Sequence, residues 1–182
     1  MKTTKKVKGF TLIELIVVIA IIGVLAAILV PTMLGYVRKS KISSANTAAS
    51  NVYKAINSAL TELDEEGIDV SGLFIVKYDG TAWSTEDSDL LEDNLGEGSK
   101  FDKKVENFFA SIAKVKSAKA QLDGGACVAI ATAQDKTYTG TYPTGVVTNE
   151  TYKDYSMSSG EVPDAALTDA CEKAKWTAST ED

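Results

Sequence analysis

Residues 15–30 form a run of sixteen positions without a charged side chain, and this run directly follows a single carboxylate, Glu14. As an α-helix, the apolar stretch of residues 10–30 would span about 31 Å, which matches the roughly 30 Å hydrocarbon core of a bilayer. A carboxylate in such a segment is costly in lipid, so its presence predicts a functional role and a cationic partner. The run therefore predicts a membrane helix in which the single acid has a specific task.

The residues before this run, 1–9, carry four lysines and no acid, which is typical of a cytoplasmic flank. A secretory signal would be cut after its apolar region at a small-residue site, for which Ala26 and Ala27 are candidates. However, the run continues past these alanines and exceeds the about 7 to 15 residues of a secretory core. A plain, uncut membrane anchor is the second alternative.

The segment Lys-Gly-Phe-Thr-Leu-Ile-Glu-Leu at residues 8–15, followed by the apolar run to Pro31, resembles the amino terminus of type IV prepilins. The resemblance covers about the first third of the chain. It implies that a prepilin peptidase removes the leader, residues 1–9, by cutting between Gly9 and Phe10, and that the new amine of Phe10 is methylated. It also implies a single-pass precursor in the cytoplasmic membrane and then an extracellular pilus at the cell surface.

The resemblance also assigns roles in assembly to three residues. Glu14 would meet the amine of the first residue of a neighbouring subunit, while Gly23 and Pro31 match positions at which the helix loses hydrogen bonds during assembly. The implied partners are further copies of the chain in a helical homopolymer, the inner-membrane pilus assembly machinery and, before assembly, the membrane.

Elementary physical chemistry agrees with these assignments. In a water-poor filament core a carboxylate and an ammonium attract strongly but are costly to desolvate, so the pair favours correct register more than stability. Gly9 has no Cβ, which lets a protease approach the backbone closely. Gly23 and Pro31 weaken a helix, since glycine is flexible and proline removes a hydrogen bond. Close helix packing at Gly23 is the alternative to local melting.

After Pro31, apolar or small residues recur at steps of three and four, which marks one face of a helix. They are Ile42, Ala45, Ala49, Val52, Ile56, Ala59 and Leu63. The pattern predicts one helix over residues 12–66 that stops at Gly67: a hydrophobic transmembrane or filament-core part, 10–36, and an amphipathic part, 37–66. With the resemblance, the expected fold is α+β and type IV pilin-like, with this long helix packed under a small antiparallel sheet. A coiled-coil dimer is the alternative.

The remaining residues, 67–182, form an expected globular head that is acidic. Of the 25 acids in the chain, 24 lie after Thr61, against 11 lysines in the same part, so nucleic acid is not an expected partner. Cys127 and Cys171, an even pair in an exported domain, predict a disulfide that closes a loop of about 45 residues and stabilises the head by roughly 4 kcal/mol. The resembled family commonly has such a bridge near its carboxyl end. If the head faces a reducing space, both are buried thiols instead.

Within the head, residues 73–78 predict a strand, followed by a turn at 79–80 and a partner strand at 81–83. A short helix is expected at 89–95, and helical spacing of apolar residues predicts a longer helix over 101–122. Three segments rich in β-branched and aromatic residues then predict strands of a small antiparallel sheet. They are 126–132, 137–142 and 146–152.

The sequence offers little for catalysis. It has no histidine, no phosphate-binding glycine loop and no metal-ligand spacing, so neither an enzyme nor a cofactor is expected. The acidic runs 64–69 and 86–93 do not fit a calcium-binding loop. Aromatic side chains suit stacking on sugars, which makes a polysaccharide surface a candidate partner, although core and sheet positions are the alternative. These residues are Trp83, Tyr138, Tyr142, Tyr152, Tyr155 and Trp176.

The predicted function is that of a structural subunit, a pilin that polymerises through its hydrophobic amino-terminal helix into a type IV pilus for adhesion, twitching motility or both. The alternative is a pseudopilin of a type II secretion or competence DNA-uptake machine, which shares the leader and Glu14. A membrane-anchored binding protein is a further alternative and predicts an uncut amino terminus. The last alternative is an anchored enzyme, which no group of residues supports.

Overall fold

A computed structural model of the chain describes residues 9–85, 95, 99–157 and 160–178. The chain divides into two compact units, residues 1–38 and 39–182. Helix α1 (Leu12–Glu65) begins in the first unit and ends in the second. Each unit is described by itself below.

The described part of the first unit is the apolar portion of α1, preceded by Gly9, Phe10 and Thr11. The helix is continuous through both Gly23 and Pro31. Next to the proline, which has no N–H to donate, the Thr32 hydroxyl donates a hydrogen bond to the carbonyl oxygen of Leu29 at 2.8 Å. Among the described residues, α1 is the one helix that is long and apolar enough to cross a membrane, and its apolar stretch is unburied.

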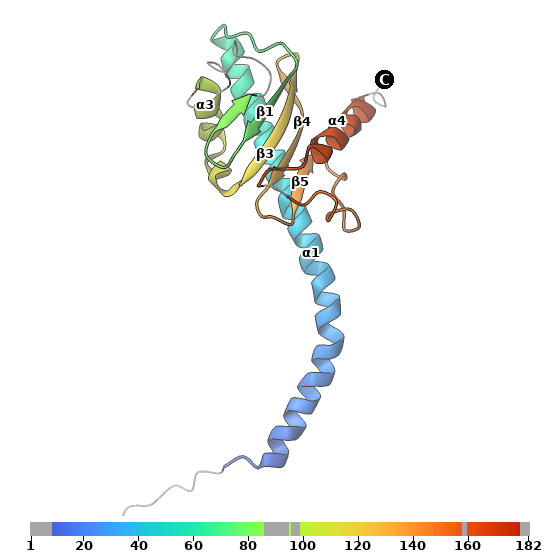
Figure 1. The fold of residues 1–182 in the computed structure, drawn as a ribbon. Helices are drawn as coiled ribbons and strands as arrows, with labels where there is room; N and C mark the ends of the chain where they lie inside the picture. The colour runs from blue at the N-terminus through green and yellow to red at the C-terminus, as the bar shows by residue number, and fades with distance from the viewer. Residues whose placement is uncertain (1–8, 86–94, 96–98, 158–159, 179–182) are drawn as a thin grey trace, which may run out of the picture. The chain divides into compact units, whose positions relative to one another are not determined.

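A five-stranded antiparallel sheet is the centre of the second unit, with the strand order β2-β1-β3-β4-β5 (Figure 1). The strands are β1 (Phe74–Tyr78), β2 (Trp83–Thr85), β3 (Ser117–Asp123), β4 (Ala126–Ala133) and β5 (Thr139–Tyr142). The predicted small antiparallel sheet is confirmed, including the hairpin of β1 with β2 and the strands β4 and β5.

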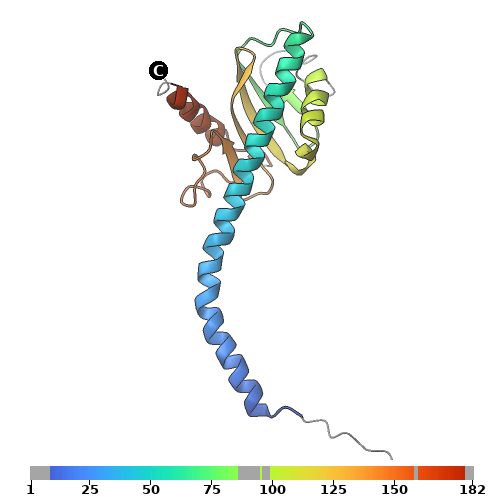
Figure 2. The ribbon, with the colours of Figure 1, turned by 180° about the vertical axis from the view of Figure 1, so that it is seen from behind.

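One face of this sheet packs on the carboxyl-terminal part of α1 (Figures 1 and 2). All seven residues of the predicted apolar stripe are buried. Between them and the sheet lies a core that includes Val76, Leu122 and Ile130, and helix α3 (Lys100–Phe108) adds Phe101 and Val105 to it. Small residues on α1 let the sheet come close. A long helix packed on a small antiparallel sheet confirms the predicted pilin-like α+β layout.

The end of α1 has the geometry that Gly67 predicts. Its backbone adopts a positive φ of 76°, which a residue without Cβ tolerates. The N–H of Ile68 donates to the carbonyl of Leu63, and the N–H of Gly67 donates to that of Asp64, both at 2.9 Å. This pair of bonds is a Schellman motif, which satisfies carbonyls that the helix end leaves open.

The opposite face of the sheet is covered by helix α4 (Asp164–Ala178), which lies on that side in both views (Figures 1 and 2). Leu167, Ala170 and Cys171 of α4 pack on alanines of β4, in a second core cluster. Sequence reasoning did not predict this helix. Its segment is rich in alanine and carries apolar residues at helical spacing, which is the signal that indicates it.

Two head predictions are wrong. Residues 101–122 form α3, the short 3₁₀ helix η1 (Ala110–Lys114) and the central strand β3 instead of one helix. Along β3, Ala118, Ala120 and Leu122 alternate with polar residues, and this period of two, combined with pairing on both sides, decides for a strand. Residues 146–152 form turns instead of a strand. The short helix expected at 89–95 lies, except for Leu95, outside the described residues.

Candidate functional site

The first turn of α1 holds Glu14 in a hydrogen-bonded ring with Thr11. The backbone N–H of Thr11 donates to the Glu14 carboxylate at 2.8 Å, and the Thr11 hydroxyl donates to the same oxygen at 2.7 Å. In return, the N–H of Glu14 points to the Thr11 hydroxyl oxygen at 3.4 Å. This is a capping box, in which two otherwise open N–H groups of a helix start are satisfied by side chains.

The capping box changes what the sequence implied about Glu14. Its carboxylate forms no ion pair with any residue that the structure describes, but it is already oriented and accepts two hydrogen bonds from Thr11. A negative charge in the first turn also complements the helix dipole. Thr11 is therefore a helix-capping residue that sequence reasoning missed. The signal was present, because Thr-x-x-Glu ahead of an apolar run is the pattern of a capping box.

The predicted cleavage position lies just ahead of this turn. Gly9 and Phe10 are outside any helix or strand and both are exposed, with the Phe10 side chain 86% accessible. A Cβ atom added at Gly9 would meet nothing within 4 Å. A protease needs an accessible peptide bond outside regular structure, so the local structure is compatible with cleavage between these two residues.

The predicted Cys127–Cys171 bridge is not formed in the structure. Both cysteines are free and buried. Cys127 packs in the cluster between the sheet and α1, where its N–H donates to the Asn57 Oδ1 at 3.0 Å, whereas Cys171 belongs to the cluster under α4. The Cys171 thiol donates to the Gln121 Oε1 at 3.1 Å.

A β-bulge is the physical reason for this correction. Along the β3–β4 ladder Gln121 pairs with Ala129, but the next residue of β3 pairs with Cys127, which leaves Val128 as an extra residue. Because side chains alternate between faces, one extra residue turns Cys127 to the α1 face, away from the face that carries Ala129 and Cys171. The spacing of the two cysteines in the sequence does not reveal such a change of face.

Both thiols are in surroundings that favour the protonated form. Burial, followed by the neighbouring Cys171, raises the pKa of the Cys127 thiol, and burial also raises the pKa of the Cys171 thiol. A raised pKa keeps the less nucleophilic protonated form. The part of the chain that the structure describes has no group of three or more histidine, cysteine or acidic residues able to hold a metal ion.

Most of the aromatic candidates for surface binding are packed instead. Tyr138 stacks on Tyr152 with ring centroids 5.5 Å apart, and Tyr142 contacts Tyr53 of α1 at 4.2 Å. The Tyr155 hydroxyl donates to the Asp169 carboxylate, which raises the Tyr155 pKa to about 12. The alternative of core and sheet positions holds for these tyrosines. The side chain of Trp176 is outside the described part.

Comparison with known proteins adds an independent observation on the amino-terminal segment. Residues 4–30 match the family described as "Prokaryotic N-terminal methylation motif". This range includes the cleavage position, the Thr11–Glu14 capping box and most of the apolar run. The segment is thus of the type IV prepilin class, and the predicted resemblance is confirmed.

Curated relatives agree with this class. The chain is 47% identical over 57 residues to the type IV major pilin protein PilA of Myxococcus xanthus, 42% over 60 residues to the type IV major fimbrial protein FimA of Dichelobacter nodosus, and 45% over 58 residues to a fimbrial protein of Pseudomonas aeruginosa. These matches cover 31%, 33% and 32% of this chain and 26%, 38% and 38% of the relatives. The chain therefore spans between about a quarter and two fifths of the length of these relatives. No solved structure matches the chain significantly.

These relatives are structural proteins. The motif, the apolar helix and the fimbrial relatives all fit the predicted localisation, a membrane-anchored precursor followed by a surface pilus. The roles of Gly9, Phe10, Glu14, Gly23 and Pro31 are not tested by these comparisons and stay predictions.

Proposed function

We propose that this protein is the structural subunit of a type IV pilus. A prepilin peptidase removes residues 1–9, the Phe10 amine is methylated, and the mature chain waits in the membrane until the pilus assembly machinery adds it to a filament used for adhesion or twitching motility. The observation that carries the proposal is the N-terminal methylation motif at residues 4–30, which extends into an unburied apolar helix that begins at Leu12. The relatives are named as major pilin and fimbrial proteins, which favours a pilus over the pseudopilin of a secretion or DNA-uptake machine.

In the filament, the Glu14 carboxylate accepts hydrogen bonds from the amine of a neighbouring subunit, in place of those from Thr11 or in addition to them. In the single chain its carboxylate accepts from Thr11, and this cap holds it at the start of the helix. The amine of Phe10 in a neighbouring subunit then supplies a positive charge that pairs with the carboxylate. Methylation keeps that charge, so the modified amine still serves as partner. Gly23 and Pro31 are where the helix loosens to fit the filament.

The decisive experiment separates charge pairing from helix capping. Glutamine at position 14 retains a capping-box side chain but has no charge, whereas leucine removes both. We expect Glu14→Gln and Glu14→Leu to insert and to be cleaved as in wild type, but both to give few or no filaments. Wild-type filament yield for Glu14→Gln would contradict the pairing with an amine.

Cleavage is tested separately. The intact mass of the filament subunit is expected to correspond to a chain that begins at a methylated Phe10. Gly9→Val is expected to leave the leader attached, because a β-branched side chain blocks close approach of the protease to the backbone. A Gly9→Val chain that still begins at Phe10 would show that the cleavage assignment is wrong.

A further inference from the structure

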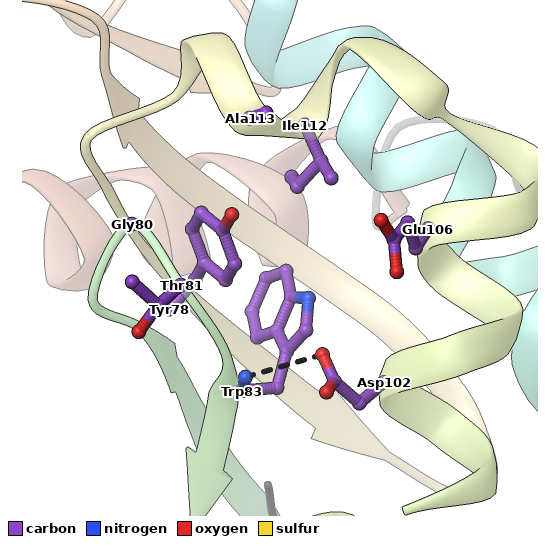
Figure 3. A pocket seen from close by; sticks show the side chains of 8 residues that line it. All are labelled: Tyr78, Gly80, Thr81, Trp83, Asp102, Glu106, Ile112 and Ala113. Carbon is purple, nitrogen blue, oxygen red and sulfur yellow. Dashed lines mark hydrogen bonds between the residues drawn. The ribbon is translucent and has the colours of Figure 1, made fainter. Parts of the chain in front are cut away.

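The second unit contains a small cavity between the β1–β2 turn, α3 and η1, with a volume of about 140 Å³ (Figure 3). It is unrelated to the assembly site. Two aromatic residues, two acids and two apolar residues account for most of its lining. They are Tyr78, Trp83, Asp102, Glu106, Ile112 and Ala113.

Two aromatic residues that are mostly buried place hydrogen-bond donors in the wall of this cavity. Tyr78 is 5% and Trp83 is 1% exposed, and their rings lie 5.3 Å apart. Neither the Tyr78 hydroxyl nor the Trp83 indole N–H makes a hydrogen bond within the described ranges of the chain, and Figure 3 shows both side chains at the edge of the cavity. Among the described residues, the buried side-chain polar atom without a partner is the Thr132 hydroxyl oxygen, so the Tyr78 and Trp83 donors are accessible from the cavity. Both are therefore available to a ligand that accepts hydrogen bonds.

Acceptors lie opposite these donors. Asp102 and Glu106 are four residues apart on α3, which places both carboxylates on one helix face. One Asp102 oxygen accepts the backbone N–H of Trp83 at 3.4 Å, which ties α3 to the start of β2 (Figure 3). Glu106 is exposed and makes no hydrogen bond or ion pair to the residues described here, so its carboxylate is open to a ligand.

The Tyr78 hydroxyl remains a donor over the physiological pH range. Burial, followed by the negative charges of Asp102, Asp79 and Glu106, raises its pKa above the usual value. A protonated phenol donates one hydrogen bond and also accepts.

The mixture of groups favours a neutral polar ligand over two simpler kinds. An anion would be repelled by two carboxylates, and a cation would pair with Glu106 but would leave the indole N–H without an acceptor. A neutral hydroxyl both donates and accepts, so neighbouring hydroxyls of one sugar unit can donate to the Glu106 carboxylate and accept from the two donors together. The apolar residues Ile112 and Ala113 of the lining suit the C–H face of such a unit.

We propose that this cavity binds the hydroxyl-bearing edge of a single neutral sugar unit at the end or along the side of a polysaccharide. The cavity is too small for a longer ligand, and single-site binding is therefore weak. If the proposed function is correct, a filament repeats the site many times, and multivalent contact converts weak sites into firm attachment to a surface.

Binding is tested on the full-length chain in micelles of a polyoxyethylene detergent, whose head group is neither a sugar nor a cation. The probes are the methyl glycosides of glucose, galactose, mannose and N-acetylglucosamine, followed by saturation-transfer NMR. The cation n-butylammonium is titrated as the competing ligand chemistry. Because monomers are measured, failure of filament assembly does not affect the result, and the Glu14→Gln chain is expected to bind sugar as wild type does.

We expect at least one of the four glycosides to bind at millimolar concentration, and Tyr78→Phe to weaken it about fivefold by removing one hydrogen bond. Tyr138→Phe, the same chemical change outside the cavity, is the matched control and is expected to bind unchanged. Glu106→Gln retains an acceptor and is expected to retain most sugar binding, whereas Glu106→Leu is expected to reduce it about fivefold.

Each opposite outcome overturns the proposal. The cavity is not a sugar site if none of the four glycosides binds, or if Tyr78→Phe binds like wild type while its melting temperature is unchanged. Binding of n-butylammonium that is lost in Glu106→Gln, without sugar binding, would show a cation site instead. Because Tyr78 is in the core, each variant is first compared with wild type by thermal unfolding, and Glu106→Leu, on the surface, tests the site independently of core packing.

Discussion

Gly140 of β5 lies so close to Ala45 of α1 that a Cβ atom added to the glycine would come within 2.0 Å of the Ala45 carbonyl carbon and oxygen. Next to this contact, the Asn46 side chain of α1 accepts the backbone N–H of Thr141 at 3.0 Å. A glycine on the strand and an alanine on the helix thus let two backbones meet directly. This contact fixes how closely the edge of the sheet approaches the amphipathic part of the helix.

Gly140→Ala is expected to destabilise the second unit by about 3 kcal/mol, because the added methyl overlaps backbone that cannot move without separating β5 from α1. Thermal or urea unfolding followed by tryptophan fluorescence measures the loss. Gly35→Ala is the matched control, since a Cβ there meets nothing within 4 Å and alanine favours a helix. Equal stability of the two variants would contradict the close approach.

Thr11→Val is expected to fray the first turn of α1, because it removes the hydroxyl that both donates to Glu14 and accepts its N–H. Amide hydrogen exchange of the full-length chain in micelles should be about fivefold faster at residue 14. Thr11→Ser retains the hydroxyl and is expected to exchange like wild type. If serine and valine give the same exchange rate, the hydroxyl has no capping role.

The stability of the second unit should fall at acid pH, partly because Glu66 becomes protonated. Hydrogen bonds from Lys100 and then Lys104 lower the Glu66 pKa to about 2, from 4.5. Because the pKa of Glu66 is lower in the folded than in the unfolded chain, its ionised carboxylate stabilises the fold. This stabilisation is fully present above about pH 4.5 and is lost as the pH falls towards 2. Since the pair is exposed, the effect is modest and is screened by salt.

Lys104→Met removes one of these partners, so the melting temperature of this variant should fall less steeply between pH 5 and pH 2 than that of wild type, at low salt. Lys103→Met serves as control, because Lys103 is exposed on the same helix and forms no ion pair with any described residue. Parallel pH profiles for wild type and Lys104→Met would rule out a contribution of this pair.

Lys119 of β3 carries a buried ammonium, with its side chain 6% exposed, between Asp164 at 2.6 Å and Glu161 at 3.2 Å. The ammonium lowers the pKa of Asp164. The two acids are mostly exposed and are easily hydrated, whereas the lysine is not. Removal of the acids and removal of the lysine should therefore reduce the free energy of unfolding by different amounts.

The double variant Glu161→Gln with Asp164→Asn leaves an unpaired buried charge and is expected to cost roughly 2 kcal/mol in the free energy of unfolding. Lys119→Met fills the same space without a charge and is expected to cost less than half of that, because its former partners return to water. Urea unfolding of both variants gives the comparison. A larger loss for Lys119→Met than for the double variant would show that the ion pair itself, and not the buried charge, determines stability.

Local signals in the chain were enough to predict the long helix, its stop at Gly67 and its buried stripe. The apolar run sets the length of the helix, glycine sets its end, and residues at steps of three and four share one face whatever packs on them. The prepilin motif is similarly local, since cleavage position, cap and apolar run are adjacent in the chain. The Thr11–Glu14 capping box belongs to the same group, although only the structure brought it to attention.

Elements that depend on contacts between distant residues were decided by the tertiary structure alone. Residues 117–123 have helical spacing with the segment before them, yet they become the central strand because β1 and β4 pair on both sides. One extra residue at Val128 places Cys127 on the opposite face from Cys171. The cavity at Tyr78 and Trp83 likewise needs β1, β2, α3 and η1 together. Sequence periodicity reports which side of its own element a residue occupies, whereas pairing, bulges and cavities arise from backbone and side-chain contacts across the fold.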